Sequence, residues 1–523
     1  MLTTEFLSIV NAICPDKEAV VFEDERVTFA TLNQRANKLA HALTRLGVKK
    51  GDRVAIMQVN TPQVVESYFA AAKLGAIWVP VNFRAKADEV AHMVKLAEAK
   101  VMLVGERYVS LVKSVHRNLT SLHHCVSLDG PTPDMQDYEP LLCGASEDEV
   151  STDVPETDTT ILMFTAGTTG MPKGVMLSHQ SFGLYVLGNV TPADPETLEK
   201  NILTVPLYHV AGVQAMLAGI YGGRTLVLQR QFELPEWMDI VQRERVNRAM
   251  LVPTMLKQVM DHPDCGKYDL SSLKVITYGA APMPLEVIKR AIRQFPDARF
   301  IQAFGQTETA STIMVLPPED HILTGSQEEV DKKLKHLASI GKPMDDVEMK
   351  VVDEQGNEVP RGNPGEILAR GPRVMSGYWK NPEATSKTIK GGWLYTGDFG
   401  YMDEDSYIYL VGRGGDIIKR GGEKISPDEI EACLQSHPKV DEAAVIGVPD
   451  PDWGEVVKAV VVVKKGLQAT PQELIEHCRV HMASFKKPES IVFVDELPRN
   501  PMGKVLRRVL REQYGKGELF AKR

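Results

Sequence analysis

A glycine- and threonine-rich loop follows an apolar strand expected at 161–164. It reads Thr165-Ala166-Gly167-Thr168-Thr169-Gly170-Met171-Pro172-Lys173-Gly174. Glycines let backbone N–H groups approach phosphate oxygens, threonine hydroxyls add donors, and Lys173 adds a positive charge. The spacing of a Walker P-loop is not met. The loop indicates phosphate binding of another kind, and a plain polar hairpin explains it equally well when it is taken alone.

A second polar segment, Gln302–Thr309, follows another expected strand. Phe304 offers an aromatic face, Thr307 a hydroxyl and Glu308 a carboxylate. Mg²⁺ is bound in proteins by one or two carboxylates together with substrate phosphates. Glu308 is therefore the candidate metal ligand beside the phosphate loop.

Three charged side chains complete the candidate set. Asp398 ends the segment Tyr395–Asp398, where an acid suits ribose hydroxyls, and Arg413 follows an expected strand. Lys504 closes the loop Pro498–Lys504. Taken singly, Asp398 and Lys504 are more often solvated surface charges.

Alternating strands and helices must position these residues. A capping box at Thr31–Gln34 predicts the start of a helix, which an apolar stripe continues to Leu46 and Gly47 ends. Further strands are expected at 53–59, 77–81, 101–104 and 299–303, and further helices at 63–74, 89–97 and 284–294. Helical crossovers between apolar strands predict a parallel sheet covered on both faces.

The pattern changes near residue 350. Short alternating strands are expected at 347–352, 365–369 and 407–411, and a compact unit follows with helices at 427–436 and 471–482 and strands at 442–447, 456–463 and 490–494. We place a domain boundary within Gly412–Gly415. The predicted fold class is α/β: a large N-terminal domain of stacked αβ sheets plus a β-subdomain (1–413), and a small mobile C-terminal α+β domain (414–523).

Composition excludes several classes of protein. The 523 residues carry 60 Lys+Arg against 69 Asp+Glu, a net charge of −9, which argues against non-specific nucleic-acid binding. The stretch 202–223 has no charged residue, but its proline and glycines favour a buried helix behind a pocket over a transmembrane segment. The N-terminus does not resemble a secretory signal. We expect a cytoplasmic protein. The sequence is compatible with contact between a surface patch and a membrane, and with a homo-oligomer as well as a monomer.

In this order the motifs resemble the adenylate-forming superfamily, which comprises acyl- and aryl-CoA ligases, luciferases and peptide-synthetase adenylation domains. The resemblance covers essentially the whole chain. It rests on the phosphate loop, the aromatic-Gly-x-Thr-Glu core ending at Glu308, the run from Gly365-Glu366 through Gly377-Tyr378, the Thr-Gly-Asp at Asp398, the stretch Gly412–Glu431 and the closing Gly503-Lys504. Within the superfamily, the sequences of these motifs most resemble those of fatty-acyl-CoA ligases.

The resemblance implies ATP, Mg²⁺ and CoA as ligands, and two half-reactions. A carboxylate attacks the α-phosphate of ATP to give an acyl-adenylate, and the CoA thiol then forms a thioester. The implied catalytic residues are Lys504, Glu308, Thr307 and His209. The implied ATP and AMP contacts are Thr165, Ala166, Gly167, Thr168, Thr169, Gly170, Lys173, Gly279, Ala280, Ala281, Pro282, Gln302, Ala303, Phe304, Gly305, Thr307, Asp398, Arg413 and Lys504.

The resemblance also implies an acyl pocket and a CoA-binding loop. The pocket candidates are His209, Val210, Gly212, Val213, Val252, Gly279 and Ala310, which are mostly small or apolar; the CoA candidates are Lys419, Gly421 and Gly422. His209 taken alone is more often a core histidine. A medium- or long-chain fatty acid fits this lining, and an alicyclic or aromatic acid also fits.

Two positions depart from the family pattern. Ala166 stands where the family usually has Ser or Gly, so one side-chain donor is lost relative to Ser. Gly415 stands at the hinge position, usually Asp or Lys, and is preceded by Gly414. Paired glycines have wide backbone freedom and so support a hinge.

Competing functions differ in what they require. Only about twenty residues follow Lys504, too few for an embedded carrier domain. A stand-alone adenylation enzyme serving a separate carrier protein stays open, and no motif favours luciferase-like oxygenation. A non-catalytic scaffold is disfavoured because Glu308, Asp398, Arg413 and Lys504 occur together.

Overall fold

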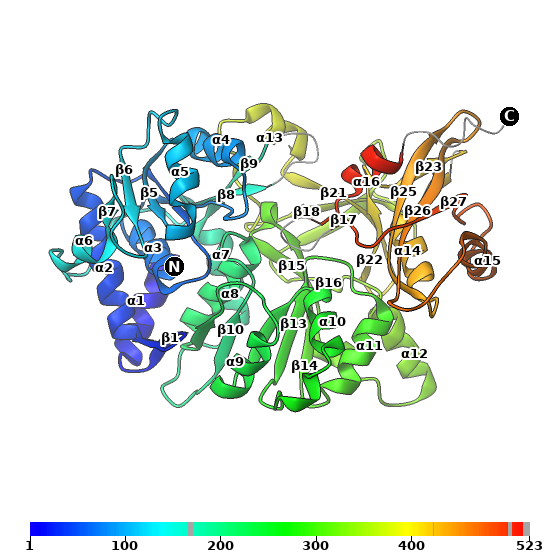
Figure 1. Ribbon diagram of the computed structural model, residues 1–523, viewed down its shortest axis with the longest axis horizontal. Helices are drawn as coiled ribbons and strands as arrows, with labels where there is room; N and C mark the ends of the chain where they lie inside the picture. Colours follow the sequence, from blue (N-terminus) through cyan, green and yellow to red (C-terminus); the bar gives the residue numbers. More distant parts are fainter. Residues whose placement is uncertain (166–170, 422, 500–504, 516–523) are drawn as a thin grey trace.

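The N-terminal part of the protein is built on two large β-sheets (Figure 1). A computed structural model describes residues 1–165, 171–421, 423–499 and 505–515. Within them, the first sheet has the order β19-β9-β8-β4-β3-β5-β6-β7. Its strands are β3 (Arg53–Met57), β4 (Ile77–Pro80), β5 (Ala99–Val104), β6 (His124–Ser127), β7 (Gln136–Asp137), β8 (Thr159–Thr165), β9 (Lys173–Ser178) and β19 (Gly377–Tyr378).

The second sheet has the order β16-β15-β14-β13-β12-β10-β11-β1-β2. It contains β1 (Glu18–Phe22), β2 (Glu25–Thr28), β10 (Lys200–Leu203), β11 (Thr225–Leu228), β12 (Arg248–Leu251), β13 (Val275–Gly279), β14 (Arg299–Gln306), β15 (Ser311–Leu316) and β16 (Lys342–Pro343). Strands β10, β12, β13 and β14 run parallel, so their carboxyl ends meet along one edge of the sheet.

Amphipathic helices cover the faces of both sheets, because burying their apolar sides drives the packing. The helices of this part are α1 (Thr3–Ile13), α2 (Phe29–Arg45), α3 (Pro62–Lys73), α4 (Ala87–Ala97), α5 (Val109–His116), α6 (Tyr138–Cys143), α7 (His179–Asn189), α8 (Val210–Tyr221), α9 (Glu236–Glu244), α10 (Pro253–Asp261), α11 (Leu285–Gln294) and α12 (Gln327–His336). One large core joins α1, α2, α3 and α8 between the sheets, and a second packs α9, α10 and α11 on the other face of the second sheet.

A smaller antiparallel sheet forms a β-subdomain after residue 347. It consists of β17 (Glu348–Val352), β18 (Gly365–Arg370), β20 (Ile389–Lys390), β21 (Trp393–Met402) and β22 (Ile408–Arg413), with α13 (Pro382–Thr388) beside it. Strands β21 and β22 pair so that Asp398 lies opposite Arg413. The sheet thereby brings the predicted ribose-binding pair together.

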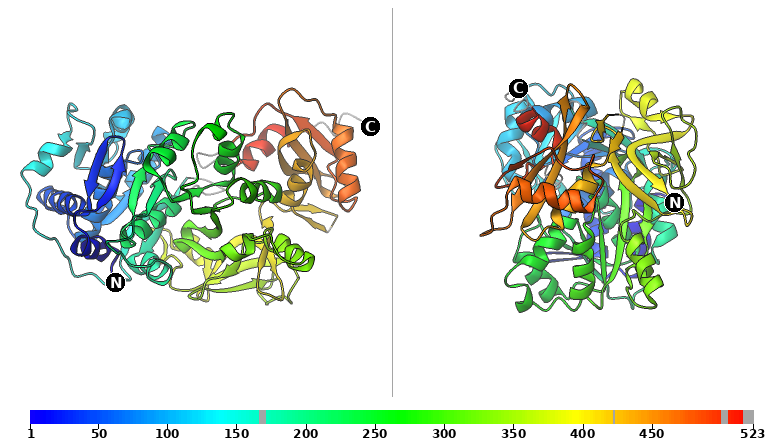
Figure 2. Two further views of the ribbon diagram at one scale, coloured as in Figure 1. Left: turned by 90° about the horizontal axis from the view of Figure 1, so that it is seen from below. Right: turned by 90° about the vertical axis from the view of Figure 1, so that its right-hand side faces the viewer.

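The C-terminal α+β unit lies at the end of the molecule opposite α1 and α2 (Figures 1 and 2). Its elements are β23 (Ile418–Arg420), β24 (Glu423–Ile425), α14 (Pro427–Gln435), β25 (Val440–Asp450), β26 (Gly454–Val463), α15 (Pro471–His481), β27 (Ser490–Phe493) and α16 (Arg507–Tyr514). It has its own core around Ile418 and Val457. Lys257 on α10 forms an ion pair of 3.0 Å with Asp441 on β25, which links the unit to the N-terminal part.

The predicted fold class is confirmed, and most predicted elements are present within one to three residues of their expected ends. Two differ in position. The helix expected to begin at Thr31 begins at Phe29, because the hydroxyl of Thr28 caps it by accepting the backbone N–H of Thr31. The uncharged stretch at 202–223 is divided between β10 and α8. No helix within the described residues is long and apolar enough to cross a membrane. The boundary in Gly412–Gly415 stays a prediction.

Candidate active site

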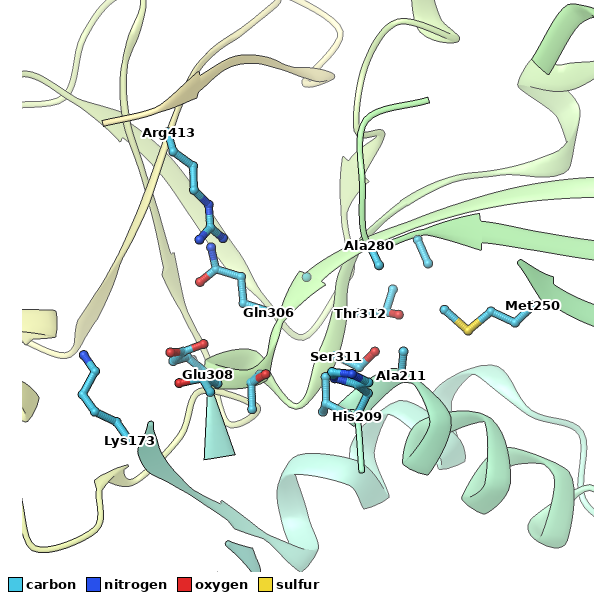
Figure 3. A pocket seen from close by; sticks show the side chains of 15 residues that line it. Lys173, His209, Ala211, Met250, Ala280, Gln306, Glu308, Ser311, Thr312 and Arg413 are labelled. Atoms are coloured by element: carbon cyan, nitrogen blue, oxygen red, sulfur yellow. The ribbon is translucent and has the colours of Figure 1, made fainter. Parts of the chain in front are cut away.

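A cavity of about 340 Å³ lies at the carboxyl ends of β12, β13 and β14 (Figure 3). This is where ligands bind in open α/β sheets. All three sheets of the N-terminal part contribute to its wall. The lining residues are Thr165, Lys173, His209, Val210, Ala211, Met250, Ala280, Ala303, Gly305, Gln306, Thr307, Glu308, Ser311, Thr312 and Arg413.

The carboxylate of Asp398 is held at the edge of the cavity by two lining side chains. Arg413 donates from Nε to Oδ1 at 2.8 Å, and Gln306 donates from Nε2 to Oδ2 at 2.5 Å. The same Gln306 amide group also donates to the carbonyl of Thr396 at 3.0 Å. The side chain of Asp398 is 8% exposed and that of Arg413 is 43% exposed. A buried acid with fixed donors is a preorganised acceptor for ligand hydroxyls.

Glu308 and Lys173 meet around the ring of Tyr378. The Tyr378 hydroxyl donates to Oε1 of Glu308 at 2.9 Å, and the Lys173 amino group lies 4.2 Å from the centre of the ring. Burial, and then the neighbouring Glu308, raise the pKa of Tyr378 well above its ordinary value. Tyr378 therefore stays a hydrogen-bond donor at neutral pH and fixes one oxygen of the carboxylate.

In the turn between β14 and β15, the backbone at Gly305 packs directly against the backbone at Ser311. A side-chain carbon added at Gly305 would overlap the carbonyl oxygen of Ser311. Ala310 and Ser311 have φ of 50° and 82°, in the left-handed region that costs energy for residues other than glycine, and Ala280 across the cavity has φ of 65°. The hydroxyl of Thr309 accepts the backbone N–H of Gln306 at 2.9 Å and helps to hold the turn.

The opposite side of the cavity is largely apolar. Val210 and Ala211 open α8, and Met250 points into the cavity from β12 (Figure 3). His209 occupies the N-cap position of α8. Burial lowers the pKa of His209 to about 3, so its imidazole is neutral at physiological pH. Its Nε2 is buried and has no hydrogen-bond partner among the described residues.

Buried polar groups behind the cavity fix Thr312. Gln214 on α8 donates to the Thr312 hydroxyl at 3.1 Å and accepts its backbone N–H at 3.0 Å. Arg373 donates to the Thr312 carbonyl and is paired with Asp346, with Nε to Oδ2 at 2.6 Å. The guanidinium carbon of Arg373 also lies 5.3 Å from the centre of the ring of Tyr185 on α7.

The structure brings many, but not all, of the predicted site residues to the cavity. Those that line it are Thr165, Lys173, His209, Val210, Ala280, Ala303, Gly305, Thr307, Glu308 and Arg413, and Asp398 contacts two lining side chains. Those that the cavity lining does not include are Gly279, Ala281, Pro282, Gln302, Phe304, Gly212, Val213, Val252 and Ala310. Lys419, Gly421 and Gly415 lie in the C-terminal unit or at its start, and Ala166, Gly167, Thr168, Thr169, Gly170, Gly422 and Lys504 lie outside the described residues.

Phe304, one of the predicted nucleotide contacts, is partly buried and does not line the cavity. Its ring packs against the core that includes Ile313 and Met314. Side chains alternate between the two faces of a strand, and its neighbours Ala303 and Gly305 are the ones that line the cavity. The contact of Phe304 with the nucleotide stays a prediction.

Sequence reasoning did not single out Gln306, Tyr378 or Met250. Gln306 lay inside a quoted motif, but its role depends on Asp398, which is 92 residues away. Tyr378 was part of a Gly-Tyr pair whose partner Glu308 is 70 residues away. Met250 lay in no predicted strand and in no motif, so nothing in the sequence placed it at the cavity.

Comparison with known proteins assigns the family. Residues 10–379 match the model of the AMP-binding enzyme family, and residues 429–504 match its C-terminal domain. The chain is 34% identical over 502 residues to feruloyl-CoA synthase of an Amycolatopsis species, covering 96% of each chain. It is 32% identical over 506 residues to the fatty acid–(acyl-carrier-protein) ligase ScoC of Streptomyces coeruleorubidus, covering 96% of this chain and 94% of ScoC.

A solved structure shares the whole fold. The anthranilate CoA ligase AuaEII, in complex with anthranoyl-AMP, superposes with a TM-score of 0.89 at 27% identity and covers 100% of this chain and 98% of its own. The chain belongs to the AMP-binding enzymes, the adenylate-forming superfamily. Within that family it is an AMP-forming acid–thiol ligase that works through an acyl-adenylate.

Proposed function

We propose that this protein is an ATP-dependent carboxylate–CoA ligase. The observation that carries the proposal is a single cavity with two halves: the polar side chains of Gln306, Glu308 and Arg413 face the apolar wall of Val210 and Met250. An acyl-adenylate is divided in the same way, into a polar nucleotide and a mainly apolar acyl group. The names of relatives support the acid–thiol chemistry.

The nucleotide half is assigned by charge and hydrogen bonding. Asp398, fixed by Gln306 and Arg413, would accept the ribose hydroxyls. Lys173 and Thr307 supply a positive charge and a hydroxyl to the phosphates. A carboxylate and a phosphate are both anionic, so positioning and neutralisation of charge must supply most of the catalysis.

Glu308 fits the role of a Mg²⁺ ligand. Tyr378 fixes Oε1, and Oε2 receives no hydrogen bond from the described residues. One carboxylate with a free oxygen, next to the place for substrate phosphates, meets the preference of Mg²⁺ for few protein ligands. When bound, the metal ion would supply charge neutralisation to the phosphates.

Lys504 is proposed to bridge the acid carboxylate and the α-phosphate, as the family resemblance implies. The C-terminal unit, taken as residues 414–523, would then turn about Gly415 and present the segment of Lys419, Gly421 and Gly422 to CoA. A side-chain carbon at Gly415 would meet no atom of the described residues within 4 Å, so none of them packs against this position. That open surrounding supports a hinge at Gly415.

The acid is proposed to be mainly apolar. Val210, Ala211 and Met250 offer small or apolar contacts, which favours a medium- or long-chain fatty acid. An aromatic acid is the second candidate, because one relative is named for feruloyl-CoA and AuaEII for anthranilate. A carrier-bound thiol is the alternative acceptor, and the name of ScoC supports it.

Acid-dependent ATP–pyrophosphate exchange tests the proposal. A panel of fatty and aromatic acids is assayed first without CoA, then for thioester formation with CoA. We expect exchange with at least one apolar acid and a thioester when CoA is added. Exchange without formation of a CoA thioester would favour a carrier-protein thiol over CoA as the acceptor. No exchange with any acid would refute the function.

A further inference from the structure

A second polar cluster lies on the strand that carries Met250, outside the residues that line the cavity. Met250 and Arg248 are two residues apart on β12 and both are partly exposed, whereas Ala249 and Leu251 between and after them are buried. Side chains two apart on a strand share a face. Arg248 therefore lies on the same face of the sheet as the cavity-lining Met250, but at the start of the strand.

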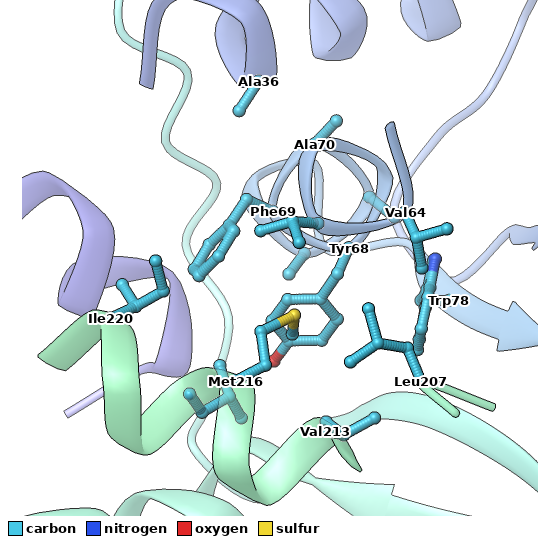
Figure 4. Packing of buried hydrophobic residues seen from close by; sticks show 14 of the residues in the cluster. Ala36, Val64, Tyr68, Phe69, Ala70, Trp78, Leu207, Val213, Met216 and Ile220 are labelled. Atoms are coloured by element: carbon cyan, nitrogen blue, oxygen red, sulfur yellow. The ribbon is translucent and has the colours of Figure 1, made fainter. Parts of the chain in front are cut away.

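Helix α8 leads from the cavity to the same cluster. Val213, Met216 and Ile220 pack on Tyr68 and Phe69 of α3 (Figure 4). The remaining side carries Ala211, Ala215 and Ala218, which are all only partly buried. Ala211 lines the cavity at the start of the helix.

Arg224 follows the end of α8, at the opposite end of the helix from the cavity. A side-chain carbon placed at Gly222 would lie 3.4 Å from the Arg224 guanidinium carbon, so the arginine sits against the C-terminus of the helix. Arg224 donates from Nε to Glu199 at 2.7 Å. The side chain of Arg224 is 13% exposed.

Two arginines share one carboxylate at this place. Arg248 reaches Glu199 at 3.4 Å, a longer contact than that of Arg224, and its guanidinium donates no other hydrogen bond within the described residues. Its side chain is 25% exposed. The cluster keeps a positive charge in excess, with a largely buried guanidinium whose donors are incompletely used.

The cluster is coupled to the cavity wall through Tyr185. The guanidinium carbon of Arg373 lies 5.3 Å from the centre of the Tyr185 ring, and the same arginine donates to the carbonyl of the lining residue Thr312. Burial raises the pKa of Tyr185, while Arg373, Arg248 and Arg224 act on it in the opposite direction. Tyr185 thus lies within electrostatic range of Arg248, while its ring contacts the arginine that holds Thr312.

The distance along the sheet from the cavity to Arg248 follows from the pairing of the strands. Ala303 at the cavity pairs with Gly279, and Val275, four residues earlier on β13, pairs with Arg248. Four residues of strand span about 13 Å. An acid with its reacting carboxylate in the cavity would reach Arg248 with a chain of medium length.

We propose that Arg248, backed by Arg224 and Tyr185, binds a second carboxylate at the far end of the acid substrate. The preferred substrate is then a medium-chain dicarboxylic acid, activated at one end. This proposal rests on the ligase function and specifies its substrate class. Arg248 acts as a specificity residue that contacts the part of the substrate that does not react.

The test compares decanedioic acid with decanoic acid in ATP–pyrophosphate exchange, with octanoic, dodecanoic and the matching dicarboxylic acids as length controls. We expect the wild-type enzyme to have at least a tenfold higher kcat/KM for the dicarboxylic member. In R248M this ratio should fall at least tenfold, chiefly through KM for the dicarboxylic acid. R243M removes an exposed arginine of α9 that is paired with Asp239, and should keep the wild-type ratio.

The outcomes are separable. If the wild-type enzyme prefers the monocarboxylic acid at every length, the proposal is overturned while the ligase function stands, and this result needs no variant to fold. The proposal also fails if R248M, with an unchanged melting temperature, keeps the wild-type ratio. If no acid of any kind supports exchange, the ligase function itself fails.

Discussion

The hydroxyl of Tyr378 donates a hydrogen bond of 2.9 Å to Glu308, across 70 residues of sequence. Because β19 pairs with β9, this contact ties the proposed metal ligand to the strand that carries Lys173. The geometry of the phosphate side therefore depends on a side chain that need not touch the substrate.

Tyr378→Phe should lower the activity and raise the Mg²⁺ concentration that the reaction needs, because Glu308 loses the hydrogen bond that fixes its carboxylate. Hydrogen bonds to charged groups contribute about 1.5–3 kcal/mol, so we expect a loss of roughly tenfold or more in kcat/KM for ATP. Raising the Mg²⁺ concentration should recover part of it. Tyr401→Phe is the matched control, since Tyr401 stacks on Tyr409 in the β-subdomain. Equal activity of Tyr378→Phe and Tyr401→Phe would remove Tyr378 from the site.

Gln306→Leu should impair ATP binding more than the use of the acid. The substitution removes the donor to Asp398 Oδ2 and leaves Arg413 as its partner in the described structure. We expect KM for ATP to rise about tenfold, as for the loss of one charge-assisted hydrogen bond, with KM for the acid nearly constant. Steady-state pyrophosphate release measures both. A rise in KM for the acid alone would contradict the ribose-side assignment.

Gly415→Pro should affect one half-reaction selectively. Proline fixes φ and restricts Gly414 before it, so rotation at this point is hindered. We expect adenylate formation and thioester formation to be slowed to different extents, as measured by pyrophosphate exchange and by CoA transfer from supplied acyl-AMP. Gly415→Ala is the control, because its added carbon meets no atom within 4 Å. Equal rates for the proline and alanine variants in both steps would exclude the hinge.

Lys504→Ala should affect the first half-reaction far more than the second. If Lys504 bridges the acid and the α-phosphate, its loss should abolish adenylate formation and largely spare thioester formation from supplied acyl-AMP. The exposed Arg508, four residues further along the chain and paired with Glu512, offers the matched control Arg508→Ala, which should leave both steps unchanged. A similar loss in both steps for Lys504→Ala would argue against a lysine that serves only the first.

The buried His321 should make the fold less stable in acid. Burial lowers its pKa to about 4, below the ordinary value of 6.5. Between those values the unfolded chain binds a proton that the folded chain does not, so stability falls as the pH falls from about 6.5 toward 4. From pH 7.5 to 5.5 the loss from this one group is about 1 kcal/mol.

His321→Gln should therefore lose less stability over that pH interval than the wild-type protein, even though it starts lower. It starts lower because the contacts of His321 with Tyr278 and Pro317, both 2.9 Å, are lost or altered. Denaturant unfolding at the two pH values gives the comparison. The same acid-induced loss in both proteins would show that His321 does not contribute to it.

Much of the fold and part of the site follow from sequence pattern. Apolar periodicity located the helices and strands, and motif order placed Glu308, Asp398 and Arg413 at one cavity. Strand pairing decided what pattern could not. Gln306 reaches Asp398 only because the end of β14 lies close to β21.

Local competition explains the remaining differences. Thr28 and Thr31 are both suitable helix caps, and the chain uses Thr28 because it leaves β2 in an extended conformation from which its hydroxyl can accept the N–H of Thr31. Choosing between them requires knowledge of where the preceding strand ends. The cluster of Arg224 and Arg248 likewise joins two distant elements, and neither arginine lies in a motif.

The tight backbone packing between β14 and its neighbours limits how this enzyme could acquire new substrates. Any side chain at Gly305 would overlap Ser311, and any at Gly279 would overlap the carbonyl of Ala303, so neither glycine can be replaced without moving the backbone. Variation during divergence is left to the opposite side, at Ala211 and Met250. A library aimed at altered acid preference should therefore concentrate on α8 and β12.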